Sequence, residues 1–149
     1  FVEIYNAGAA PVCDLSAFTI VGAGSGAANV DLPAVALASN DFFIVEESGT
    51  VTSADAAHSF VASGMNLRNA GEVLRLCPVA TAGDATTCDV ANPTGNGWFA
   101  GSNSVPKTTM ERTALATDGS QPTSWQNGAP SSPGTASFAG TPGDTSTCP

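Results

Sequence analysis

The sequence predicts an all-β fold, built as a sandwich of short strands, on three observations. Its apolar residues fall in short runs bounded by Gly, Pro, Asn, Asp and Ser, which is the pattern of a β-sandwich. No segment shows a convincing helical period, and residues 34–38 leave room for a single turn. Only 11% of the residues are charged, against about a quarter in an average protein, and many small residues replace them, as in extracellular β-proteins.

The first half of the chain contains three predicted strands. Val2 and Ile4 alternate with Glu3, so one face of the first strand is apolar and the other is polar. The second strand is expected at residues 15–21. Residues 42–45 are apolar throughout, which favours a central position in the fold.

The second half of the chain continues the alternation of strands and turns. A weaker strand is expected at residues 59–62, and the turn at residues 69–71 leads into a strand at 72–79. Two further strands are expected at residues 86–91 and 108–113. The strands at 72–79 and 86–91 are predicted to form a hairpin.

The chain divides into a predicted sandwich domain at residues 1–116 and a C-terminal segment at 117–149. A chain of 149 residues has the length of one domain. In the C-terminal segment, 22 of 33 residues are Ser, Thr, Pro or Gly, so it has too little apolar surface to fold by itself. Trp125 and Phe138 are its apolar anchors. We therefore expect this segment to be extended and to pack on the sandwich or on a neighbouring molecule.

The four cysteines, Cys13, Cys77, Cys88 and Cys148, have spacings that match no zinc motif. In a secreted chain an even number indicates two disulfides, with three possible pairings. We favour Cys77–Cys88, which would link the outer side of the predicted hairpin because alternation puts Cys77 opposite Leu76, and Cys13–Cys148, which would tie the C-terminal segment to the first loop. Four buried free thiols are the alternative. Paired cysteines predict an extracellular or cell-surface location.

The charge balance excludes two classes of partner. The net charge is −9, and the basic residues are only Arg68, Arg75, Lys107 and Arg112. Nucleic-acid binding requires several cations to neutralise phosphates, so we expect no nucleic-acid partner and no attraction to anionic membranes. No apolar run approaches the roughly 20 residues of a membrane span, and no membrane insertion is expected.

Four short motifs are shared with a known family. They are FVEIYN at residues 1–6, VCDLS at 12–16, NAGE at 69–72 and TMER at 109–112. Together they resemble the lamin-tail domain, an immunoglobulin-like β-sandwich that is found in nuclear lamins and in secreted bacterial proteins. Ala-Phe at residues 17–18 departs from the Gly-Trp that is usual in this family.

The resemblance implies a module without catalytic residues. We expect an extracellular structural domain that makes protein–protein contacts, as a homo-oligomer or as a subunit of a cell-surface assembly or filament. The alternative is an accessory binding domain of a larger secreted hydrolase of the nuclease or phosphatase type. A carbohydrate platform formed by Trp98, Phe99 and Trp125 is a further variant of the binding function.

Three other segments carry residue types that are used in catalysis or nucleotide binding. The glycine-rich residues 22–27 would need a following helix to bind a dinucleotide, and Pro33 and its neighbours oppose one, so a hairpin loop is expected. His58 is the only histidine and no G-x-S-x-G motif accompanies it, which predicts a surface histidine. Glu46 and Glu47 point to opposite faces of a strand and are expected to be solvated charges.

Calcium is the one metal that the sequence leaves open, and no other cofactor is expected. Asp84, Asp89, Asp118 and Asp144 lie in predicted loops, where carboxylates and carbonyls can bind this ion. None of them matches the D-x-[DN]-x-[DN]-G pattern, and ordinary turn chemistry is the alternative.

Arg112 is the charge that the pattern places nearest the core. If Met110 faces the core, alternation places Arg112 on the same side. A buried guanidinium requires a carboxylate or several carbonyls. We expect Glu3, on the first strand, to be its partner in a structural ion pair.

Overall fold

The computed structural model describes residues 1–22, 29–47, 59–102, 104, 108–115 and 117–128, and this part of the chain is all-β. Its strands are β1 (Val2–Tyr5), β2 (Phe18–Val21), β3 (Val30–Asp31), β4 (Phe42–Glu46), β5 (Ser59–Val61), β6 (Leu74–Pro78), β7 (Asp89–Ala91), β8 (Met110–Arg112) and β9 (Trp125–Asn127). Its helices are single 3₁₀ turns, namely η1 (Leu15–Ala17), η2 (Val79–Thr81), η3 (Ala85–Thr87) and η4 (Pro122–Ser124). None of these described helices is long and apolar enough to cross a membrane.

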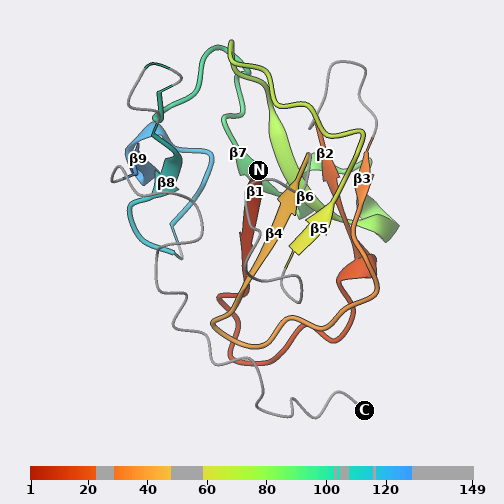
Figure 1. Cartoon of the computed structure of the whole chain (residues 1–149). Coiled ribbons are helices and arrows are strands. Elements are labelled where there is room, and N and C mark those ends of the chain that lie inside the picture. The colour runs from red at the N-terminus through yellow and green to blue at the C-terminus, as the bar shows by residue number, and fades with distance from the viewer. Residues whose placement is uncertain (23–28, 48–58, 103, 105–107, 116, 129–149) are drawn as a thin grey trace.

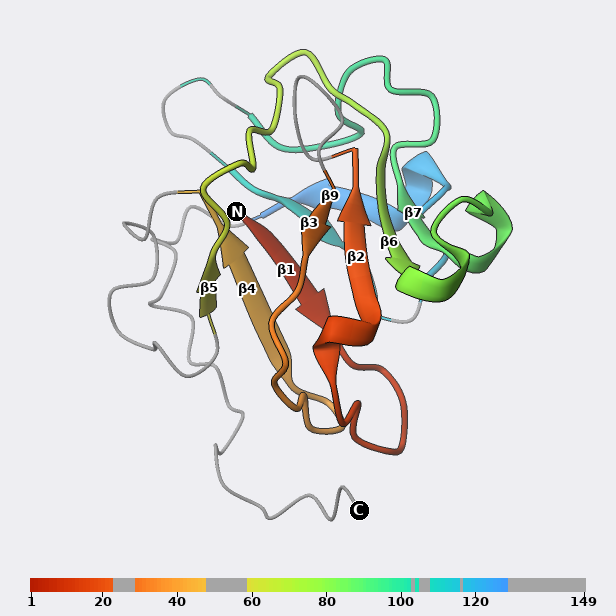
Figure 2. The same ribbon diagram turned by 90° about the vertical axis from the view of Figure 1, so that its right-hand side faces the viewer.

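The strands form two main sheets and a separate hairpin (Figure 1). The first sheet has the order β1-β4-β5, in which β1 is antiparallel and β5 is parallel to β4. The second sheet has the order β3-β2-β6-β7 and is antiparallel throughout. Figure 2 shows β2 and β3 in front of β1 and β4, so the two sheets face one another as layers. Strands β8 and β9 pair antiparallel and lie to one side, away from β3.

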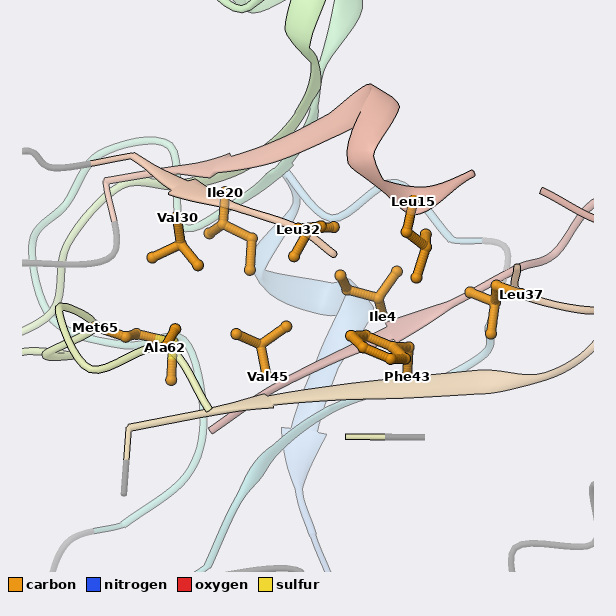
Figure 3. Packing of buried hydrophobic residues seen from close by; sticks show 10 residues of the cluster. All are labelled: Ile4, Leu15, Ile20, Val30, Leu32, Leu37, Phe43, Val45, Ala62 and Met65. Atoms are coloured by element: carbon orange, nitrogen blue, oxygen red, sulfur yellow. The ribbon is translucent and has the colours of Figure 1, made fainter. Parts of the chain in front are cut away.

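The hydrophobic core lies between the two sheets. Register places Ile4 opposite Phe43 on one sheet and Ile20 opposite Val30 on the other, so each pair shares a face. Figure 3 shows these side chains, with Val45, directed toward one another across the gap between the sheets. Ile20 is 1% exposed and Val45 is 0% exposed. Each such side chain contributes about 1.5–3 kcal/mol of hydrophobic stabilisation, which makes this cluster the main source of stability.

Asn6 holds together the loops at one end of the sheets. It is 8% exposed, and its Nδ2 donates to the carbonyls of Ala10, Leu37 and Ala38 while its Oδ1 accepts from the Gly8 amide. Buried polar groups are stable only when they are hydrogen-bonded. Asn6, the residue after β1, therefore ties the loop at residues 8–10 to the loop at residues 37–38.

The structure corrects several strand predictions. Residues 15–17 form η1, not the start of a strand, because the Asp14 carboxylate accepts from the Ser16 amide and caps a helical turn. Residues 85–87 form η3 for the same reason, with Asp84 as the cap. Strands β3 and β9 were not predicted. Strand β9 pairs with β8, so the expected boundary between residues 116 and 117 falls between two paired strands.

Candidate functional surfaces

The expected Cys77–Cys88 disulfide is present, with an S–S distance of 2.09 Å. It joins the end of β6 to the start of β7 across the loop that contains η2 and η3. Cys77 is 0% exposed, so the outer side of the hairpin is covered and does not face solvent at this point. Cys13 is also disulfide-bonded, which excludes free thiols at the three described cysteines. Its expected partner, Cys148, lies outside the described residues.

Arg112 connects the β8–β9 hairpin to the second sheet. Its Nη2 donates to both carboxylate oxygens of Asp89, at 2.8 and 2.7 Å, and its Nη1 donates to the Thr117 carbonyl. The guanidinium lies over the Trp125 ring, with 4.7 Å between its Cζ and the ring centroid. The Trp125 Nε1 in turn donates to the Gly119 carbonyl. These contacts bring β7, β8, β9 and the intervening loop together around one cation.

The prediction that Arg112 forms an ion pair with Glu3 is wrong. Arg112 is partly buried, as expected, but its carboxylate partner is Asp89. Asp89 pairs with Leu76 in the sheet register and so projects from the inner face of β7, toward the position of Arg112. Glu3 instead projects outward from β1, where Glu111 lies near it. Burial first, and then repulsion from Glu111, raise the pKa of the Glu3 carboxyl.

The two tryptophans of the proposed carbohydrate platform make contacts within the chain. Trp98 donates from Nε1 to the Arg68 carbonyl at 2.7 Å. Trp125 is half-buried beneath the Arg112 guanidinium. Phe99 is half-buried as well. Trp98 and Trp125 are therefore committed to intramolecular contacts and are not presented together as a flat exposed surface.

The acidic loop residues that were considered as calcium ligands each contact a different partner. Asp84 accepts from Thr86 and Asp118 accepts from Ser120, and these hydrogen bonds lower the pKa of both carboxyls. Asp89 pairs with Arg112. Within the described ranges, no group of three or more His, Cys, Asp or Glu residues is arranged to hold a metal ion. Asp144, the fourth calcium candidate, lies outside these ranges.

The pair Glu46–Glu47 differs from its prediction. Glu47 is exposed, but Glu46, the last residue of β4, is only 2% exposed. Both carboxylates act on the N-terminal amine of Phe1. Burial lowers the pKa of this amine, and the two glutamates oppose that effect. His58 and most of the glycine-rich loop, at residues 23–28, lie outside the described residues.

Strand β5 is an open edge of the first sheet. It pairs with β4 on one side, and no other strand of the described chain pairs with it on the other. Val61, at the end of β5, is 49% exposed. An open edge presents unpaired backbone N–H and C=O groups to any strand that approaches it.

Comparisons with known proteins found no match to this chain among protein-family models, curated proteins or solved structures.

Proposed function

We propose that this chain is a non-catalytic extracellular module that makes protein–protein contacts and assembles with further copies of itself. The proposed arrangement is an immunoglobulin-like sandwich of the lamin-tail type. Two facing sheets around one core support this arrangement, and the disulfide-bonded cysteines support an extracellular location.

The observation that carries the proposal is the outer edge of β5, with which no other strand of the described chain pairs. This strand has only three residues, is parallel to β4, and ends in an exposed valine. Proteins commonly protect an edge strand with a charged residue or a proline, and β5 has neither. An added strand from a second molecule would satisfy its backbone groups and cover Val61.

Replacement of Val61 with lysine tests this contact. The charge is expected to block strand addition and to reduce assembly of the native, unreduced protein, as measured by sedimentation velocity and negative-stain microscopy. The control is Val79→Lys, because Val79 is 51% exposed but lies in η2 rather than at a sheet edge. Equal assembly of the two variants and the wild type would remove β5 from the proposal. A wild type that stays monomeric would remove self-assembly altogether.

A further inference from the structure

The β8–β9 hairpin is a separate element beside the sandwich. It forms a two-stranded sheet of its own, and no strand of either main sheet in the described chain pairs with it. The hydrophobic core cluster of the described residues contains none of its side chains. Figure 1 shows the hairpin to one side of the two main sheets. Because an isolated two-stranded hairpin is only marginally stable in water, this element needs a surface to dock on.

The surface on which the hairpin docks is the edge of β7. Asp89 of this strand accepts two hydrogen bonds from Arg112 of β8. Gly119, in the loop between β8 and β9, is buried, and a Cβ at this position would overlap both the Val90 carbonyl oxygen and the Arg112 guanidinium. Strand β7 is the last strand of the second sheet. The hairpin and its loop therefore cover a sheet edge that would otherwise be open to another strand.

A short hinge connects the hairpin to the sandwich. The chain is held to the sandwich as far as Trp98, whose Nε1 donates to the Arg68 carbonyl. Gly101 already belongs to the hairpin, because its amide donates to Oδ1 of Asn127 at 2.7 Å. The hinge therefore consists of residues 99–100. Hinges of this kind are a few residues long and absorb the backbone rotation when a packed element moves.

The ion pair between Arg112 and Asp89 is the polar contact that holds the hairpin in place. Within the described chain, it supplies the only hydrogen bonds between residues 101–128 and the residues before the hinge. Asp89 is 60% exposed, so water and salt compete for this pair. The contact of Arg112 with the Trp125 ring lies within the hairpin and moves with it. Once the ion pair opens, the hairpin can leave β7 as a unit.

We propose that the β8–β9 hairpin exchanges between two copies of the chain, so that Arg112 of each copy binds Asp89 of the other. The hairpin of a second copy fits the β7 edge because the contacts of the exchanged dimer are those already made within one chain. Exchange of an identical element is a known route to dimers, and short hinge loops promote it. The inference rests on the proposed self-assembly, and it adds a contact distinct from β5.

Charge reversal on the two sides of the contact tests the exchange. Asp89→Arg and Arg112→Asp are made separately in the Val61→Lys variant, in which the β5 edge is blocked. Each variant alone places like charges together, both in its closed chain and in its exchanged dimer, and is expected to dimerise weakly. In an equimolar mixture, both exchanged contacts pair opposite charges. We expect a heterodimer whose dissociation constant, from sedimentation velocity at about 0.15 M salt, is at least about tenfold lower than that of either homodimer.

A second pair of reversals controls for net charge. Asp31→Arg and Arg68→Asp change the same charges at exposed side chains outside the contact. Their mixture is expected to differ from the separate variants by less than about twofold in dissociation constant. Both test variants also remain strongly acidic, against a net charge of −9 in the wild type, so overall attraction cannot produce their heterodimer.

Hinge length gives a second test that leaves the contact itself unchanged. Insertion of Gly-Ser-Gly between Phe99 and Ala100 in the Val61→Lys parent lets the hairpin return to its own chain, and it should raise the dimer dissociation constant at least about tenfold. This variant decides the matter if a charge reversal fails to fold by circular dichroism.

The outcomes separate this exchange from the proposed function. The inference is overturned if the folded variants form no heterodimer on mixing, if the longer hinge leaves dimerisation unchanged, or if the Val61→Lys parent is monomeric at every concentration. Wild-type assembly that Val61→Lys abolishes would leave the proposed function standing without the exchange. A heterodimer between variants that both carry Val61→Lys would support the exchange even if β5 contributes nothing to assembly.

Discussion

Replacement of Arg112 with methionine should destabilise the protein by about 2–3 kcal/mol. Methionine keeps much of the apolar stem but loses the guanidinium and its three contacts. The bidentate pair contributes about 1 kcal/mol, because Arg112 is 18% exposed but Asp89 is 60% exposed and solvent screens the charges. The Trp125 contact contributes about 0.5–1 kcal/mol. The hydrogen bond to the Thr117 carbonyl contributes about 1 kcal/mol more.

The assay is equilibrium urea unfolding of the unreduced protein, with the free energy extrapolated to water. Asp89→Asn and the double variant complete a thermodynamic cycle, and we expect a coupling of about 0.5–1 kcal/mol between Arg112 and Asp89. The same cycle with Glu3→Gln should show no coupling. Arg68→Met is the control, at an exposed position, and should change stability by less than about 0.5 kcal/mol. An Arg112→Met variant as stable as the wild type, or coupling to Glu3 rather than Asp89, would refute the assignment.

Three further changes test other contacts of the fold. Gly119→Ala should cost about 2 kcal/mol or more in urea unfolding, since its Cβ would overlap a guanidinium and a backbone carbonyl, whereas Gly83→Ala meets open space and should be neutral or slightly stabilising. Replacing Cys77 and Cys88 together with alanine should cost about 3 kcal/mol, because the bond closes a loop of 11 residues; no loss of stability would show that the bond is dispensable. Because burial raises the pKa of Glu3 above 4.5, its ionisation should destabilise the fold as pH rises past that value. Glu3→Gln should therefore be more stable than the wild type at pH 7, with the difference shrinking toward pH 4.5, and a difference independent of pH would contradict this reasoning.

The main sheets could be predicted from local sequence because their strands alternate or are wholly apolar. Ile4, Ile20 and Val45 are core residues in strands that the pattern identified. The Cys77–Cys88 bond followed from its hairpin. Strand β3 has only two residues, which is too short to show any period. This strand forms by pairing with the edge of β2.

The contacts between distant segments could not be predicted from local sequence. Strand β9 has the sequence Trp-Gln-Asn, which carries no alternating apolar signal, and it forms by pairing with β8. The partner of Arg112 depended on the register of β6 with β7, which turns Asp89 to the inner face. Local periodicity places a side chain on a face of its own strand but does not identify its neighbours across the sheet.

The molar mass of the native, unreduced chain in solution, measured by light scattering over a range of concentrations, tests self-assembly most directly. We expect the mass to rise above the 14.7 kDa of a single chain as concentration increases. A mass that stays at 14.7 kDa up to about 1 mM protein would contradict self-assembly. A dissociation constant above about 1 mM corresponds to a binding free energy of less than about 4 kcal/mol, which is too small for a specific assembly.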